Sequence, residues 1–497
     1  MILEVISTLA LGVVVAVIID YVIILTKLKR YPPGPFPLPL IGNLHLLHNQ
    51  PMKAFKRLAK DYGGVMSFSF GRERIVIIQD IDSAREALLT NGVQFAGRPQ
   101  DNFVTGIVTK GFQDIVFADY GPRLNAMRKI AHGALKMYGE GLSKLGDSVS
   151  VEIEKLFERF DEKNGQEFDP AADLGLSVTN IICAILFGKR YKLDDGEFKE
   201  VLYFSYLIGK FDVTAAVNFI SWLRYLPNQP LSDLKRGILK RDAFLDAKLQ
   251  EHRETLDVNN PRDFTDLVLY MQDLERTEGS STANVSDVNL EQIMSDLFLA
   301  GVETTTTTLR WSLLYLAAWP EIQMRIAEER KERLGTRRPC LKHRGNLPYF
   351  EAVVHEIMRM SSVVPLGVPH KTMSDTICKG QEIPAGTQIW FNIWAMHNDE
   401  NQWKEPDSFR PERFLDETGN LIIGAKKSYL PFGAGRRVCL GEALAKMELF
   451  MFLSSILYRY VVIKGEGESS DLEGIVGVVN IPKPFKVKLA LRSEATR

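Results

Sequence analysis

A single cysteine in a glycine-rich loop constrains this chain more than any other feature. The stretch PFGAGRRVCLGEALAKMELF, residues 431–450, places Cys439 directly before a segment with the apolar spacing of a helix. The N–H groups and the positive dipole end at a helix start stabilise a thiolate, which is the form of cysteine that binds soft metals. Gly435 and Gly441 allow backbone angles or close approaches that other residues cannot make, so the loop can lie flat against a large planar group. An isolated buried cysteine usually packs as a small hydrophobic residue, so the indication of a ligand comes from the loop around it.

The same loop indicates which planar group is bound. Arg437 stands two residues before Cys439, where it can meet carboxylates. Haem is planar, carries two propionates and takes an axial cysteine thiolate in oxygen-activating enzymes. The spacing Phe432-x-x-Gly435-x-Arg437-x-Cys439-x-Gly441 resembles the haem-binding loop of the cytochrome P-450 superfamily. This resemblance implies haem b with Cys439 as the iron ligand, and Phe432, Gly435, Arg437 and Gly441 as residues that contact the haem.

A second motif, SDLFLAGVETTTTTLRW over residues 295–311, predicts a helix on the other side of the haem. Ala300 and Gly301 leave room where larger residues would not, and the threonine hydroxyls can bend a helix by bonding to carbonyls four residues earlier. The stretch resembles the P-450 groove that receives dioxygen. That resemblance implies that Glu303 and Thr304 deliver the protons that split the O–O bond. Without the cysteine loop, an ordinary core helix would explain the threonines equally well.

A third motif predicts a buried ionic network. Glu356 and Arg359 stand one helical turn apart in VVHEIMRM, among apolar residues that indicate burial. The segment FRPERF, residues 409–414, resembles the one that completes a Glu-Arg-Arg core network in P-450 enzymes, which implies that Arg413 is the third member. We expect this network to support the haem side of the fold rather than to take part in chemistry.

Three single residues are expected, by the same resemblance, to bind the haem propionates together with Arg437. They are Arg98 in FAGRP, Arg128 in LNAMRKIA and His370 in GVPHK. Outside this context, surface charge or a satisfied histidine would explain them. Leu124 stands where the family commonly has a tryptophan, so an indole hydrogen bond to a propionate is missing.

The first thirty residues predict a membrane anchor. Residues 6–26, ISTLALGVVVAVIIDYVIILT, are long enough to cross a bilayer and contain one charge, Asp20. Lys27, Lys29 and Arg30 follow, and the positive-inside rule then keeps the rest of the chain in the cytosol. Together with the resemblance, this predicts a single-pass protein of the endoplasmic reticulum membrane.

The chain is expected to have three parts. Residues 1–30 are the anchor, residues 31–50 a stiff proline-rich connector, and residues 51–497 a haem-thiolate catalytic domain. Helical patterns dominate the catalytic part, while the strand-like stretches VMSFSF, RIVIIQD and TQIWFNIW are short. We therefore expect a mainly α fold of the P-450 type, a large helical domain with a minor β-sheet region. A net charge of -1 and the lack of a groove-reading module argue against nucleic acid as a partner.

The substrate prediction rests on a narrower resemblance. Within the superfamily, DLFLAGVETTT, GVPHK and IWAMHNDENQW are most similar to the steroid 17-alpha-hydroxylase/17,20-lyase group. Arg241 and Asp296 match residues associated with the substrate cavity of that group, whereas Leu299 replaces a glycine and Tyr206 an asparagine. We expect a monooxygenase that uses O2 to hydroxylate a small apolar substrate, in first place a steroid. Two alternatives stay open: a broad xenobiotic or fatty-acid monooxygenase, and a non-catalytic haem-thiolate protein, which the Glu303–Thr304 pair disfavours.

Electrons must come from another protein, because the chain has no flavin or nicotinamide fingerprint. The resemblance implies NADPH-cytochrome P-450 reductase, with cytochrome b5 as a further partner. Basic residues that could form a docking face are Arg123, Lys129, Lys426, Lys427, Arg436 and Lys446. Complementary charge at such a face mainly speeds encounter, and a solvated surface would explain the same residues.

Overall fold

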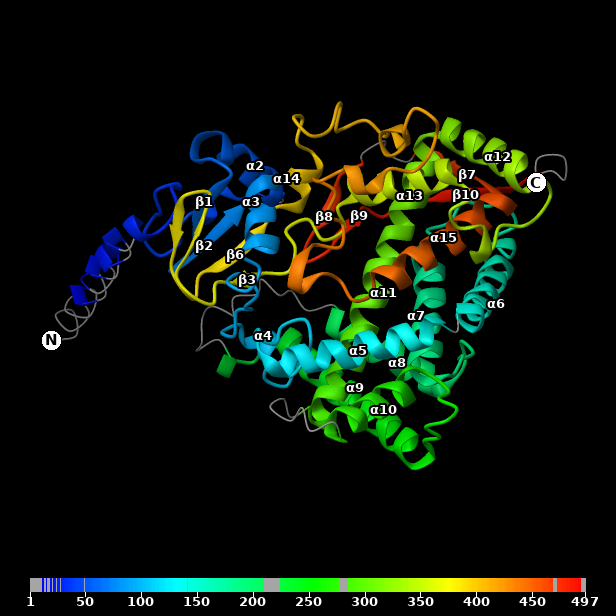
Figure 1. Cartoon of the computed structure of the whole chain (residues 1–497), viewed down its shortest axis with the longest axis horizontal. Coiled ribbons are helices and arrows are strands. Elements are labelled where there is room, and N and C mark those ends of the chain that lie inside the picture. Colours follow the sequence, from blue (N-terminus) through cyan, green and yellow to red (C-terminus); the bar gives the residue numbers. More distant parts are fainter. Residues whose placement is uncertain are drawn as a thin grey trace.

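The computed structural model describes residues 11–12, 15, 18–19, 21–23, 25–26, 28–48, 50–140, 142–209, 224–277, 285–467 and 472–492. Helices make up most of the molecule, and a small sheet-rich part lies at the side where the N-terminal segment enters (Figure 1). The predicted mainly α fold with a minor sheet region is confirmed.

The helices follow one another along almost the whole chain. They are α2 (Pro51–Tyr62), α3 (Ile81–Arg85), α4 (Phe103–Val108), α5 (Pro122–Glu140), α6 (Leu142–Asp161), α7 (Ala171–Phe187), α8 (Gly196–Gly209), α9 (Gln229–Thr255), α10 (Phe264–Thr277), α11 (Asp287–Ala318), α12 (Pro320–Leu334), α13 (Pro348–Ser361), α14 (Ile393–His397) and α15 (Glu442–Arg459). The 32-residue helix α11 runs through the middle of the molecule and contacts α7, α13 and α15 (Figure 1). It starts at a capping box, in which Ser286 and Asn289 bond to each other's backbone N–H groups, and it ends just before Pro320.

The largest sheet has four strands in the order β1 (Val65–Phe70), β2 (Glu73–Ile78), β6 (Gln388–Phe391) and β3 (His370–Lys371). The strand-like stretches in the sequence correspond to β1, β2 and β6. Strands β1 and β2 form a hairpin, while β6 joins β2 in parallel from more than 300 residues later in the chain. The three two-stranded sheets pair β7 (Tyr460–Lys464) with β10 (Val487–Leu491), β4 (Thr376–Cys378) with β5 (Gln381–Ile383), and β8 (Gly474–Val476) with β9 (Asn480–Pro482).

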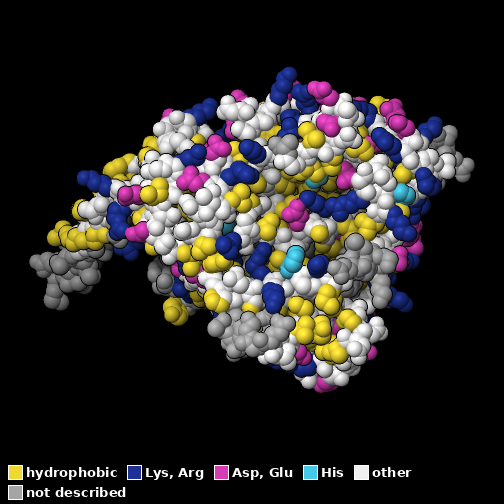
Figure 2. Space-filling view, in the orientation of Figure 1, with side chains coloured by type: hydrophobic (Ala, Val, Ile, Leu, Met, Phe, Trp, Pro, Cys, Tyr) yellow, Lys and Arg dark blue, Asp and Glu magenta, His cyan; other side chains and the backbone are white. Residues whose placement is uncertain are grey.

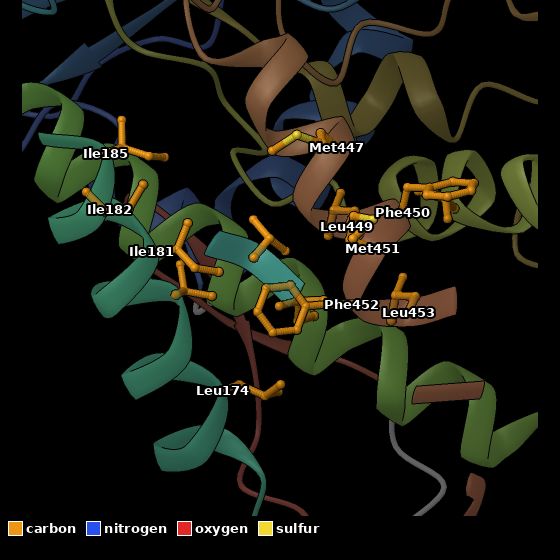
Figure 3. Packing of buried hydrophobic residues seen from close by; sticks show 14 of the residues in the cluster. Leu174, Ile181, Ile182, Ile185, Met447, Leu449, Phe450, Met451, Phe452 and Leu453 are labelled. Atoms are coloured by element: carbon orange, nitrogen blue, oxygen red, sulfur yellow. The ribbon is translucent and has the colours of Figure 1, made fainter. Parts of the chain in front are cut away.

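The main hydrophobic core lies around α11. Ile181 and Ile182 of α7 and Phe452 of α15 lie beside it, whereas Phe450 of α15 points to the other side, where it contacts Phe350 of α13 (Figure 3). Helix α15 is buried without interruption from Met447 to Leu457, which is typical of a helix that is apolar on all sides. The cysteine loop is therefore held by one of the most deeply buried helices in the described part of the molecule.

The N-terminal region is only partly described. Among the described residues, no helix is both long enough and apolar enough to cross a bilayer. Most of the predicted anchor, residues 6–26, falls outside the described residues, and the anchor stays a prediction. The connector that follows lies against β1, because Ser67 donates from its backbone N–H to Pro33 O at 2.8 Å and from its hydroxyl to Pro32 O at 2.6 Å. The prolines therefore join the folded body rather than standing away from it.

Candidate active site

Cys439 stands at the start of α15, as its sequence position predicts. Its backbone N–H donates to Phe432 O at 3.1 Å, which closes the loop, and Gly441 caps the helix. The side chain is exposed, although protein surrounds it closely enough that burial raises the pKa of its thiol. The N–H groups of Gly441 and Glu442 donate to the sulfur, and they act with the charge of Arg128 to lower the same pKa. The Cys439 sulfur is therefore accessible although protein surrounds it, and it can bind a ligand held inside the protein.

The glycines of the loop have different roles. Gly435 has φ +72°, and a Cβ at this position would lie 2.1 Å from the carbonyl oxygen of Leu88. Leu88 belongs to a short π-helical turn, η3 (Glu86–Thr90). Gly435 is therefore needed for a close backbone contact that the sequence did not reveal. A Cβ on Gly441 would only touch the Cys439 sulfur, at 4.0 Å.

Three arginines and a histidine gather on one side of this space. Arg98 donates to Val116 O, Val368 O and Pro369 O at 2.7–2.9 Å, and Arg437 donates to Ala96 O and Ala118 O, both at 2.7 Å. Arg128 donates to Val438 O at 2.8 Å, and His370 Nδ1 donates to Phe95 O at 2.6 Å. The structure thus brings together all four residues predicted to bind propionates. Leu124 is buried in the core and offers no polar group to them.

The positive charge of this cluster exceeds the negative charge of the acids around it. Burial and the charges of Arg437 and Arg128 hold the pKa of Arg98 well below its usual value, and burial with Arg128 lowers the pKa of Arg437 to about 10. Among the described residues no acceptor engages Arg98 Nη2, Arg128 Nε and Nη1, or His370 Nε2. Free donors and unbalanced positive charge suit a group that carries carboxylates. The residues present therefore fit haem, with its propionates at the arginines and its iron at Cys439.

The groove residues on α11 lie on more than one face of the helix. The Thr304 hydroxyl donates to Ala300 O at 2.7 Å, and the side chains of Ala300 and Glu303 are exposed. Burial raises the pKa of Glu303, while the charge of Arg310 lowers it. A Cβ on Gly301 would instead lie 2.9 Å from Ile182 Cδ1, so this glycine allows the close approach of α11 to α7. The structure therefore gives Gly301 a packing role, and its part in an oxygen pocket stays a prediction.

The predicted core network is present and fully buried at its centre. Glu356 accepts from Arg359 Nε at 2.8 Å and Nη2 at 2.9 Å, and from Arg413 Nε at 3.0 Å. Arg359 also donates to His397 O and Pro406 O, both at 2.8 Å. Arg413 lies in a short 3-10 helix, η7 (Pro411–Phe414), so the network ties α13 to the chain that leads to the cysteine loop.

The predicted substrate residues are not all brought together. Arg241 is buried and donates to Ser295 Oγ at 3.1 Å and Val108 O at 2.8 Å. Asp296 accepts from the N–H of Ile115 at 2.7 Å, so Arg241 holds the end of α4 and Asp296 the segment that follows it. Leu299 is half-buried, whereas Tyr206 on α8 is 62% exposed.

Two acids near the site were missed in the sequence. Asp114 is fully buried beside Arg98 and Arg437, and burial raises its pKa to about 6. Glu448 lies on α15, bonds to Thr305 of α11, and burial raises its pKa to about 8. A lone acid within the apolar stretch MELFMF could have indicated Glu448, but no local signal marks Asp114.

Comparisons with known proteins agree with this geometry. A family model described as Cytochrome P450 matches residues 32–489. The chain is 39% identical to the steroid 17-alpha-hydroxylase/17,20 lyase of Ictalurus punctatus over 93% of its length and 91% of that protein. It is 35% identical to cytochrome P450 2U1 of Homo sapiens, over 94% of this chain and 90% of that one.

A solved structure gives the same result for the fold. It is described as a zebra fish cytochrome P450 with progesterone, and it superposes with a TM-score of 0.79 at 35% identity, over 88% of this chain and 99% of that chain. The cysteine at the start of α15, the donor cluster and the helical fold thus occur in a chain that resembles these enzymes over nearly its whole length. The chain belongs to the cytochrome P450 family of haem-thiolate monooxygenases.

Proposed function

We propose that this monooxygenase hydroxylates a steroid, as a steroid 17-alpha-monooxygenase does, with O2 and with electrons that originate from NADPH. The observation that supports this substrate class most directly is the 39% identity, over 93% of the chain, to a steroid 17-alpha-hydroxylase/17,20 lyase. The solved relative whose title names progesterone supports the same class of ligand.

The residues of the site have separate roles in this proposal. Haem, held by Cys439, supplies the oxygen-activating chemistry. Arg98, Arg128, Arg437 and His370 orient it by binding its propionates. The donors that these four residues leave unused point to that role.

Glu303 and Thr304 move protons to the reacting oxygen. Glu303 is suited to this because burial raises its pKa, so that its carboxyl group holds a proton more readily than an ordinary glutamate does. The Thr304 hydroxyl donates to Ala300 O, so it can relay a proton by turning away from that carbonyl.

Electrons reach the site from NADPH-cytochrome P450 reductase, and cytochrome b5 is a second partner. Lys and Arg side chains are spread over the face that contains α5 and the start of α15 (Figure 2). Arg123, Lys129, Lys427 and Arg436 are exposed there, which suits an acidic partner. The predicted anchor at residues 6–26 would hold the protein in the endoplasmic reticulum membrane beside that reductase.

A second candidate is a monooxygenase of fatty acids or foreign compounds, which stays open because the chain is also 35% identical to cytochrome P450 2U1, whose name specifies no steroid. A binding screen with the purified haem protein distinguishes the two. A steroid that enters the site should shift the haem from low to high spin, and turnover with reductase should then give one main hydroxysteroid. A spin shift with fatty acids alone, or products at many positions of unrelated compounds, would support the second candidate.

A further inference from the structure

A polar pocket lies where α12 ends and α13 begins, and residues 420–421 complete its lining. Figure 1 shows these two helices. Its volume is about 440 Å³, within the range typical of small-molecule sites. The polar residues that line it are Arg333, Arg337, His343, Asn346, Glu351 and Asn420. None of its lining residues belongs to the cysteine loop or to α11, so the monooxygenase site does not account for it.

The pocket is part of a strongly basic segment. Residues 330–346 contain a single acid, Glu332, and seven basic residues: Arg330, Lys331, Arg333, Arg337, Arg338, Lys342 and Arg344. Some of these are engaged, as Arg338 is with Glu154. Among the described residues, no acceptor engages the Arg333 side chain, although it borders the pocket. Two of the seven basic residues, Arg333 and Arg337, line the pocket.

Most hydrogen-bonding groups at the pocket are donors without an acceptor. Arg337 uses only Nε, which donates to Leu334 O at 3.1 Å, so both terminal nitrogens stay available. His343 Nδ1 accepts from the N–H of Cys340 at 3.1 Å, which puts the ring proton on Nε2. Glu351 is the one acid in the lining, and it already accepts from Gly345 N at 2.5 Å. A ligand that matches this set is rich in acceptors and negatively charged.

The start of α13 does not supply the site. The backbone N–H groups of its first turn, at Tyr349 and Phe350, already donate to the Glu329 carboxylate at 2.7 and 2.9 Å. The donors that remain are side chains, and two of them are guanidinium groups. Paired guanidinium forks recognise phosphate oxygens in a way that single lysines do not.

We propose that this pocket binds a small soluble molecule that carries two or more linked phosphate groups. Arg333 and Arg337 contact the phosphates, and His343 and Asn346 donate to the remaining oxygens. A single inorganic phosphate would fill only part of a 440 Å³ space, so the pocket favours a di- or triphosphate chain over the isolated ion.

The test is calorimetric titration of the full-length, haem-loaded protein with inorganic tripolyphosphate at constant ionic strength. We expect saturable binding with a stoichiometry of one. The double variant Arg333→Gln/Arg337→Gln should weaken it by about tenfold or more, because it removes two charge-assisted contacts. Asn346→Leu should weaken it without changing the charge.

The matched control is Lys342→Gln/Arg344→Gln, which removes the same two charges from the same exposed segment but not from the pocket lining. It should change the affinity by no more than about twofold, since only screened long-range attraction is lost. Equal weakening in both double variants, non-saturable binding, or unchanged affinity in Arg333→Gln/Arg337→Gln with its haem content intact would each overturn the proposal.

Discussion

The Cys439 thiol is subject to opposing local influences. Burial raises its pKa, while two backbone N–H groups at the start of α15 and the charge of Arg128 lower it. The sequence was sufficient to predict that this sulfur stands at a helix start beside a cationic residue. The N–H donors suit the role of axial ligand predicted for Cys439, since they stabilise the anionic sulfur that iron requires.

Replacement of Cys439 by histidine should change the spectrum of the reduced, carbon monoxide-bound protein. A thiolate ligand gives a Soret band shifted far to the red, and an imidazole does not. We expect the red-shifted band in the natural protein and its loss in Cys439→His. Cys183 is a suitable control because it is fully buried among apolar residues of α7, so Cys183→Ala should keep the band. A red-shifted band in Cys439→His would contradict the assignment.

Replacement of Thr304 by alanine should separate electron use from product formation. The hydroxyl that now bonds to Ala300 O is lost, and a proton relay would lose its last donor. We expect NADPH consumption to continue while the fraction that ends in product falls by about tenfold or more, with peroxide released instead. Thr304→Ser keeps the hydroxyl and should retain most of the product yield. Equal yields in Thr304→Ala and the natural protein would exclude Thr304 from the relay.

At the scale of elements, the sequence predicted α11 well but not the neighbours that shape it. The pattern of residues 295–311 marks the helix, and the back-bonded threonine hydroxyls follow from their spacing. The close approach of Gly301 to Ile182 could not be predicted, because it depends on how α7 and α11 cross. The same limit applies to Gly435 and Leu88, which are distant in sequence and in contact only in the fold.

Gly301→Ala should destabilise the protein through this crossing. The added methyl would lie 2.9 Å from Ile182 Cδ1, closer than such contacts allow. We expect a loss of about 1–3 kcal/mol in the free energy of unfolding, measured by urea denaturation. Ile182→Val removes the opposing methyl and should restore much of the loss in the double variant. No recovery in the double variant would show that the contact with Ile182 is not the cause.

Arg413→Ala should be far more harmful than Arg410→Ala, although the two residues are neighbours. Arg413 bonds to the buried Glu356, and its removal leaves that carboxylate partly uncompensated, at a cost of about 3–5 kcal/mol. Arg410 forms an exposed pair with Glu405, worth less than about 1 kcal/mol. Urea unfolding and haem content of the two purified variants would measure the contrast, and similar losses would contradict it.

At the scale of the whole molecule, buried histidines couple stability to pH. Burial lowers the pKa of His355 and of His397 to about 3. Between about pH 6.5 and 3 the unfolded chain therefore binds protons that the folded protein excludes, so stability falls as pH falls. Glu448 acts in the opposite direction, because its pKa of about 8 lets the folded state keep a proton that the unfolded chain releases.

His355→Gln should flatten this acid dependence. It removes one of the groups that take up a proton on unfolding, and each contributes up to about 1.4 kcal/mol per pH unit. Urea midpoints between pH 5 and 6.5 would measure the slope. His132 is exposed, and His132→Gln is the control that should keep the slope unchanged. An unaltered slope in His355→Gln would contradict the assignment.

For the whole chain, the family and the cysteine loop could be predicted because they depend on residues that are close in sequence. The propionate-binding set could be predicted only through resemblance, since Arg98, Arg128, His370 and Arg437 are far apart in the chain. Asp114 and the exposure of Tyr206 could not be predicted, because burial is a property of the complete fold.

The arginine cluster also affects how the chain completes its folding. Arg98, Arg128 and Arg437 bind backbone oxygens of residues 96–118 and of the cysteine loop while repelling one another. Asp114 and Asp119 balance only part of this repulsion, and a group that carries carboxylates would balance the rest. Newly made protein that has not bound haem should therefore be cut by trypsin between residues 98 and 123. The supply of haem during synthesis should determine the fraction of protein that stays intact.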